Sequence, residues 1–304
     1  MAATGHPVGL TLDTIVLATD FSPASEKAAG YAKALARHFS SNLTLAHVID
    51  TSIAIPPADA TRAPLIDEMR DTSAENLARL LNAMTSAGVR ASAHTLEAEY
   101  PAEALVGFAK GIGAHLIVEG TRARHGFSRA VLGSRAEEII RHASCPVLTV
   151  GPHAKPANNG ALSFQTVVFA ADFSSDAEHQ AAVALSFAQE SVAKLYLCHV
   201  LQHPSEDISE NMALEQKVES SLKELFPQST YNWCNPECVV ESGAVASHIL
   251  ELAERVHAGL IVLGAKRHAS WLSHLAEGTV GHVLAGAQCP VLTVAPCTSQ
   301  PPAE

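Results

Sequence analysis

The sequence predicts an α/β protein built as a tandem repeat of two open parallel five-stranded sheets, each with helices on both faces. The first observation is a repeated hexapeptide, "CPVLTV", at Cys145–Val150 and again at Cys289–Val294. The second is that short apolar runs rich in β-branched residues alternate with segments of helical period, as in helix-covered parallel sheets. The chain has 304 residues, enough for two units that each bury a core.

The repeat covers nearly the whole chain. "TIVLATDFS" at Thr14–Ser22 returns 152 positions later as "TVVFAADFS" at Thr166–Ser174. "AHLIVEG" at Ala114–Gly120 returns as "AGLIVLG", now only 144 positions later. The second copy is therefore shorter by about eight residues, lost between its second strand and its later strands.

A stretch rich in Pro, Gly and Asn separates the two copies and shows no apolar period, which indicates a linker. We expect a first domain over residues 12–151, a linker over 152–162 and a second domain over 163–296. The residues outside these ranges are expected to be loose ends.

Each copy is expected to follow the order β-α-β-α-β-α-β-α-β. In the first copy, "TIVLATD" (14–20) is a continuous apolar run, typical of a strand buried on both faces. The next helix begins at Ser22, a good N-cap residue, with Pro23 at its first position. Apolar residues then recur at helical spacing as far as Phe39. "NLTLAHVI" (42–49) predicts the second strand.

The other elements of the first copy are predicted by the same criteria. They are a helix over Leu65–Ala87 that ends at Gly88, a strand over 89–97, a helix over 101–113, a strand over 115–120, a helix over Arg135–His142 and the final strand in "CPVLTV". Pro146 and Pro290 stand at the entry to the two final strands, where a strand tolerates proline.

The composition excludes several classes of protein. The hydrophobic content of 47% is that of a globular chain, and the net charge of −11 argues against a broad surface for nucleic acid or anionic membrane. No apolar run approaches the ~20 residues that span a bilayer. The first residues also lack the basic and apolar regions of a signal peptide. We therefore expect a cytoplasmic protein.

Cysteines and histidines raise the question of metal or redox chemistry. Cys234 and Cys238 are spaced unlike the usual zinc ligands, so we expect structural residues, with metal or redox use as the alternative. His268, His274 and His282 fit no metal-site template and are expected to face solvent, with a metal cluster as the alternative.

His47 and His199 occupy the same position in the two copies, at the end of an apolar strand. A half-buried structural role is the first interpretation, and contact with a ligand or pH sensing is the second.

Open α/β sheets bind ligands beyond the carboxyl ends of their strands. Asp20 follows the first strand there, His47 and Val48 end the second, and the loop "GTRARHGFSRAVLGS" follows the fourth. This loop ends at a predicted helix, whose first backbone amides suit a phosphate. Candidate binding residues in it are those that let an anion approach or add positive charge: Gly120, Arg122, Arg124, Gly126, Arg129, Gly133 and Ser134.

These motifs, in this order, resemble a tandem universal stress protein, that is, two Rossmann-like domains in one chain. ATP-binding members of that family carry G-x-x-G-x(9)-G-[ST] in the loop. Gly120, Gly133 and Ser134 match this motif, while Ala123 stands at its second glycine.

The resemblance implies that the first copy binds ATP or another adenine nucleotide. Asp20 and the backbone at Val48 would contact the adenosine end, and Mg²⁺ would accompany ATP.

The second copy departs further from the motif. Gly264 is kept, but Arg267 replaces the second glycine, Trp271 is bulky, and Glu277 stands near the predicted helix start. A slip of one residue recovers Gly278–Thr279 as that start. We expect a degenerate phosphate loop.

The resemblance also bears on assembly, because single-domain members dimerise through the last strand. In a tandem chain, Val147–Val150 is expected to pair with Val291–Val294, and the chain is expected to form homodimers.

Two functions remain open. The first is a stress-response regulator whose N-terminal domain binds an adenine nucleotide. The second is a ligand-free structural protein that acts through its dimer surface. The motifs G-x-S-x-G, H-E-x-x-H and G-x(4)-G-K-[ST] are absent from the sequence. No catalytic residue is therefore assigned, and slow ATP hydrolysis involving Asp20 is a weaker third option.

Overall fold

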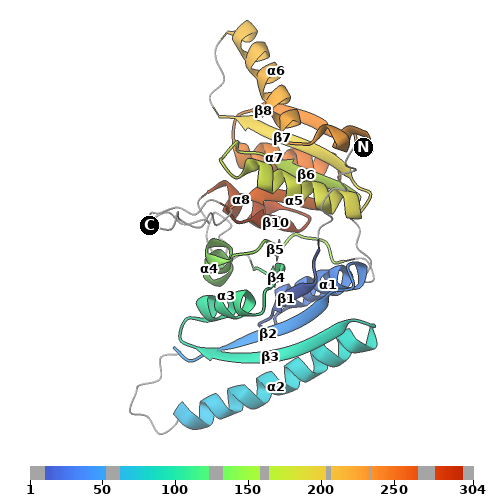
Figure 1. Cartoon of the computed structure of the whole chain (residues 1–304). Coiled ribbons are helices and arrows are strands. Elements are labelled where there is room, and N and C mark those ends of the chain that lie inside the picture. The colour runs from blue at the N-terminus through green and yellow to red at the C-terminus, as the bar shows by residue number, and fades with distance from the viewer. Residues whose placement is uncertain are drawn as a thin grey trace, which may run out of the picture.

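The computed structural model (Figure 1) describes residues 11–52, 62–122, 133–157, 164–202, 207–232, 234–265 and 278–296. The first copy contains β1 (Thr14–Ala18), α1 (Pro23–His38), β2 (Asn42–Asp50), α2 (Arg62–Ser86), β3 (Arg90–Ala98), α3 (Pro101–Gly111), β4 (Leu116–Gly120), α4 (Ser134–His142) and β5 (Val147–Val150). The second contains β6 (Thr166–Ala170), α5 (Ala177–Glu190), β7 (Lys194–Leu201), α6 (Ile208–Glu224), η1 (Gln228–Asn232), β8 (Glu237–Ser242), α7 (Val245–Arg255), β9 (Leu260–Gly264), α8 (Thr279–Gly286) and β10 (Val291–Val294). The predicted α/β order is therefore present twice.

All the described strands belong to one ten-stranded sheet with the order β3-β2-β1-β4-β5-β10-β9-β6-β7-β8. Pairing is parallel within each copy. The two halves join through β5 and β10, which run antiparallel with Leu148 opposite Leu292. The repeated hexapeptide thus forms the seam between the copies, which is the pairing expected from the sequence.

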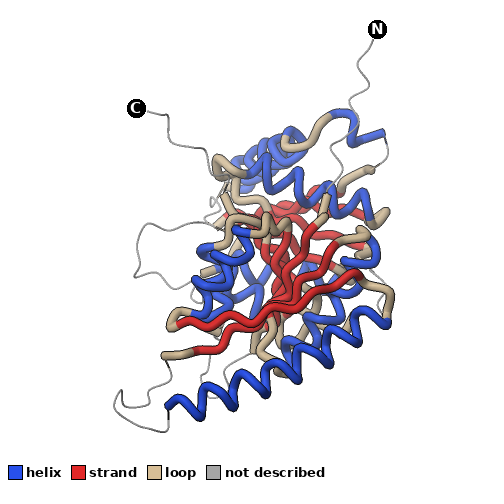
Figure 2. The backbone as a smooth tube through the Cα atoms, turned by 60° about the horizontal axis from the view of Figure 1, so that its bottom comes forward, coloured by secondary structure: helices blue, strands red, loops and turns tan. Residues whose placement is uncertain are grey.

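Helices cover both faces of this sheet, as Figure 2 shows. One core layer packs α1, α2, α5 and α6 against one face, with Leu35 and Phe187 among its fully buried side chains. The other packs α3, α4, α7 and α8 against the opposite face and includes Leu105 and Leu252. Both layers run through the two copies, so the seam is part of the core.

The first helix begins where the sequence predicts. Ser22 is its N-cap, and its hydroxyl oxygen accepts a hydrogen bond from the Ser25 N–H at 3.3 Å, with Pro23 next in the chain. The helix therefore starts directly behind the end of β1, and its first turn lies at the carboxyl edge of the sheet.

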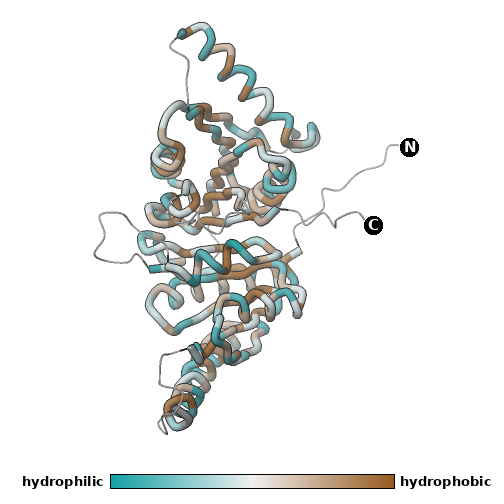
Figure 3. Tube along the Cα trace, turned by 90° about the vertical axis from the view of Figure 1, so that its left-hand side faces the viewer, coloured by the Kyte–Doolittle hydropathy of each residue, from teal (hydrophilic) through white to brown (hydrophobic). Residues whose placement is uncertain are grey.

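The two copies differ most in their second helix. α2 has 25 residues and α6 has 17, and α6 is followed by the short helix η1. Residues of opposite hydropathy alternate along α6, at the top of Figure 3. In the described parts of the chain, no helix combines the length and the apolar character needed to cross a membrane.

Candidate functional site

A cleft opens at the carboxyl ends of the strands of the first copy. It lies beside β1, where the sheet order reverses between β2 and β4, the place where open α/β sheets bind ligands. The empty space in it, counted together with the open solvent at its mouth, is about 600 Å³. The ends of β1, β2 and β4 form its floor, and α3 and α4 form its walls.

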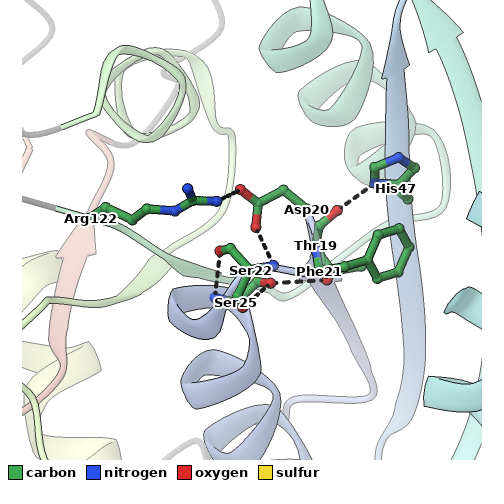
Figure 4. Close-up of polar contacts among 7 residues, drawn as sticks. All are labelled: Thr19, Asp20, Phe21, Ser22, Ser25, His47 and Arg122. Atoms are coloured by element: carbon green, nitrogen blue, oxygen red, sulfur yellow. Dashed lines mark hydrogen bonds and ion pairs between the residues drawn. The ribbon is translucent and has the colours of Figure 1, made fainter. Parts of the chain in front are cut away.

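The floor at β1 is a tight turn into α1, shown in Figure 4. Phe21 has a φ of 58°, a left-handed conformation that is rare for a bulky residue. Two neighbouring side chains stabilise it. Thr19 Oγ1 accepts from the Phe21 N–H at 3.1 Å, and Asp20 Oδ1 accepts from the Ser22 N–H at 3.0 Å.

Asp20 presents its carboxylate at the mouth of the cleft. Its Oδ2 accepts a hydrogen bond at 2.8 Å from the guanidinium of Arg122, which follows β4 (Figure 4). Burial opposes ionisation of this carboxyl. Hydrogen bonds from Ser22 and Ser25 and the charge of Arg122 outweigh that effect and lower the pKa of Asp20. Asp20 is therefore an ionised hydrogen-bond acceptor at neutral pH.

His47 braces the same turn from β2. Its Nδ1 donates to the Thr19 carbonyl over 2.7 Å, and its ring centroid lies 4.6 Å from that of Phe21. Desolvation lowers the pKa of His47, so the ring is neutral at pH 7. His199 repeats both contacts, at 2.8 Å from the Ala171 carbonyl and 4.7 Å from the Phe173 ring. The shared geometry supports the structural interpretation of this pair.

The two glycines of the predicted phosphate motif have different roles. A Cβ on Gly120 would lie 2.2 Å from the Ala24 carbonyl oxygen, so the bare backbone lets β4 pack against the first turn of α1. Gly133 is the N-cap of α4 and has no side chain to cap the helix, which begins at the exposed Ser134. The first N–H groups of α4 therefore remain suited to an anion.

The walls of the cleft are mainly apolar. Leu105 of α3 and Ile139 of α4 line it, together with Val48 at the end of β2. The ladder between β1 and β2 ends with the bond from the Thr19 N–H to the Ala46 carbonyl. The backbone of Val48 thus extends past β1 at the edge of the cleft.

Two charged side chains in the cleft were not among the residues predicted from the sequence. Arg135 is in the first turn of α4, and its Nη2 lies 2.5 Å from Oδ2 of Asp50 at the end of β2. This ion pair links α4 to β2. Glu119 of β4 lies on the floor with an exposed fraction of only 3%. The Thr149 hydroxyl donates to its Oε1 at 3.0 Å.

The second copy has the same turn, here between β6 and α5, but a different residue at the position of Glu119. Phe173 has a φ of 50°, and Asp172 Oδ1 accepts from the Ser174 N–H at 2.9 Å. Gly278 is the N-cap of α8, which begins at Thr279, so the helix start survives with the one-residue slip. Leu263 takes the place of Glu119 in the corresponding strand.

The structure brings most predicted site residues together. Asp20, Val48 and Gly120 line the cleft, Arg122 contacts Asp20, and Gly133–Ser134 begins α4. Nine of the residues named above lie outside the described residues: Ala123, Arg124, Gly126, Arg129, Arg267, His268, Trp271, His274 and Glu277.

The remaining candidates for metal or redox chemistry lie apart from this cleft. Cys234 and Cys238 are free thiols, the first of them buried. His282 lies on α8 rather than in a loop, and its Nδ1 donates to the Gly278 carbonyl at 2.9 Å. Within the described ranges, no group of three or more His, Cys, Asp or Glu side chains is placed to hold a metal ion.

Comparison with known proteins shows the same family twice along the chain. The sequence model of the universal stress protein family matches residues 11–151 and 163–295. A universal stress protein of Methanocaldococcus jannaschii is 34% identical over 137 residues, which are 45% of this chain and 80% of that protein. One of Thermus aquaticus is 33% identical over 138 residues, which are 45% of this chain and 97% of that protein.

Solved structures share the fold of the whole chain. A universal stress protein of Archaeoglobus fulgidus has a TM-score of 0.71 at 19% identity, covering 93% of this chain and 98% of that one. A protein of Pseudomonas aeruginosa described as a possible universal stress protein has a TM-score of 0.57 at 18% identity, covering 94% of both chains.

Proposed function

The chain belongs to the universal stress protein family, and on this premise we propose that its first copy binds ATP or another adenine nucleotide as a regulatory ligand. The observation that carries the proposal is the cleft at the reversal of strand order, which has an ionised carboxylate at its mouth and an uncapped helix start beside it.

The phosphate end of the ligand would lie at the start of α4. The backbone N–H groups there carry the positive end of the helix dipole. Arg122 adds an exposed guanidinium, which is paired with Asp20. Gly120, Gly133 and Ser134 keep the spacing that ATP-binding family members have, whereas the alanine at 123 departs from it.

The nucleoside end would lie on the floor formed by the ends of β1, β2 and β4, between α3 and α4. Asp20 offers carboxylate oxygens to ligand hydroxyl groups, and the backbone of Val48 offers polar groups at the far side. The apolar side chains of Leu105 and Ile139 suit the faces of a flat ring. Mg²⁺ would accompany the phosphates of ATP.

The second copy serves as scaffold in this proposal. It repeats the turn at Asp172, but it has Leu263 on the floor where the first copy has Glu119. Regulation would follow from occupancy of the first copy alone. We assign no catalytic group.

The proposal predicts that Asp20→Ala weakens ATP binding to the full chain at least tenfold, because it removes a charged hydrogen-bond acceptor. The measurement is isothermal titration calorimetry with ATP and with AMP. Protein purified without added nucleotide and then denatured should release an adenine nucleotide.

The chain supplies its own control for that substitution. Asp172→Ala removes the equivalent turn contact in the second copy and should leave the affinity unchanged. If the two variants changed the affinity for ATP equally, the role of Asp20 would be limited to stabilising the turn. Absence of both released nucleotide and calorimetric binding in the unaltered chain would reject the proposed function.

A further inference from the structure

Glu119 is a carboxyl group buried at the floor of the cleft, on a strand that is otherwise apolar. Its neighbours Leu116, Ile117 and Val118 are at most 1% exposed, and Glu119 itself is 3% exposed. A burial this deep costs several kcal/mol for a charged carboxylate without a cation. It needs an explanation beyond packing, because a leucine fills this position in the second copy.

The surroundings of Glu119 favour its uncharged form. Among the described residues, the charged or titratable side chains that share the cleft are Asp20, His47 and Arg135, and the Arg135 guanidinium is paired with Asp50. On α4, Glu137 pairs with Arg141, and on α3 the lining residues are Pro101, Ala102 and Leu105. Burial raises the pKa of Glu119 to about 8, and the hydrogen bond from Thr149 offsets only part of this effect. The group is therefore protonated at pH 7.

An uncharged carboxyl offers a donor and an acceptor side by side. Oε1 accepts from Thr149 and keeps a second lone pair, while the proton can reside on Oε2. Adenine presents the complementary pair, a ring nitrogen that accepts and an amino group that donates. On the corresponding edge, guanine has a carbonyl, which accepts, beside a protonated ring nitrogen, which donates. Its donor and acceptor are therefore in the reverse order, and the carboxyl group of Glu119 would have to turn to pair with them.

We propose that Glu119 is the residue that recognises the base in this cleft, donating a hydrogen bond from its carboxyl group to a ring nitrogen of adenine. The inference rests on the proposed nucleotide binding and adds to it the determinant of base preference. The carboxyl also accepts from the exocyclic amino group of the base. Loss of its proton removes the donor and leaves an acceptor facing the ring nitrogen, itself an acceptor, so base recognition is coupled to pH.

The test measures adenosine binding to the full chain by calorimetry at pH 7 and pH 9. Adenosine is the probe because it has no phosphate that titrates in this range. The unaltered chain should bind about tenfold more weakly at pH 9, one unit above the pKa of Glu119. Glu119→Gln keeps a donor and an acceptor, and should bind adenosine with no such pH dependence.

Glu119→Leu, which copies the second domain, should weaken adenosine binding about tenfold at pH 7 and abolish any preference over guanosine. Thermal melts of both variants verify folding, and a leucine suits this apolar layer.

Adenosine binding that is independent of pH in the unaltered chain and equal in Glu119→Leu would overturn this inference and leave the proposed function standing. If the unaltered chain binds neither adenosine nor ATP at either pH, the proposed function fails, and base recognition by Glu119 fails with it.

Discussion

At the scale of single residues, the two motif glycines show how one sequence pattern can serve two physical purposes. Gly120 is required by packing, because its backbone touches the first turn of α1 with no room for a methyl group. Gly133 has an ordinary φ of −62°, and the nearest atom to a Cβ there would be Thr121 Oγ1 at 3.5 Å. Packing therefore accounts for the glycine at 120 but not for the glycine at 133.

This difference predicts that Gly120→Ala destabilises the chain by roughly 1–3 kcal/mol, since the Ala24 backbone must shift to admit the methyl group. Gly133→Ala is the comparison: its methyl group meets no backbone atom, and it should cost less, about 0.5–1 kcal/mol, because alanine is a poorer N-cap than glycine. Urea unfolding of the two variants measures both values. Equal stabilities would show that β4 and α1 are less closely packed than the structure indicates.

Residues of the site differ in how far the sequence could predict them. Asp20, Val48 and Gly133–Ser134 were predictable because each lies near the end or the start of an element whose period is clear in the sequence. The contact of Gly120 with Ala24 was not, because it joins two elements across the sheet edge. Glu119 left one signal, the contrast between "LIVEG" and "LIVLG" in the two copies, but its burial depends on how α3 and α4 cover β4.

At the scale of elements, the turn from β1 to α1 is the feature that both copies preserve most closely. Phe21 and Phe173 share the left-handed conformation, and each is followed by a serine whose N–H is held by the preceding aspartate. A histidine from the neighbouring strand supports each turn. The turn is therefore a structural feature of both copies. In our proposal, only the turn of the first copy also contacts a ligand.

His47→Ala is predicted to destabilise the chain by about 1–2 kcal/mol at pH 8, because it removes the hydrogen bond to Thr19 and the contact with Phe21. Desolvation lowers the folded-state pKa of His47. Its stabilising contribution is therefore present above the ordinary pKa of about 6.5 and declines as the pH falls through the folded-state value.

Thermal unfolding at pH 5 and pH 8 tests this sign. The loss caused by His47→Ala should be smaller at pH 5. A larger loss at pH 5 would mean that the folded chain prefers the protonated ring.

At the scale of the whole molecule, the repeated final strand joins the two copies into one sheet. β5 and β10 satisfy each other at the centre of one sheet, so an edge that could otherwise recruit another chain is used internally. Any association between two chains must therefore use a different surface. The two copies are not equivalent at this edge of the sheet, because Leu263 stands in the second copy where Glu119 stands in the first.

The number of nucleotides bound per chain tests the central claim most directly. Equilibrium dialysis of the full-length protein against labelled ATP should saturate at one nucleotide per chain, and Asp20→Ala should remove that site while Asp172→Ala preserves it. Saturation at two equivalent sites, or no binding at ATP concentrations up to about a millimolar, would contradict the account.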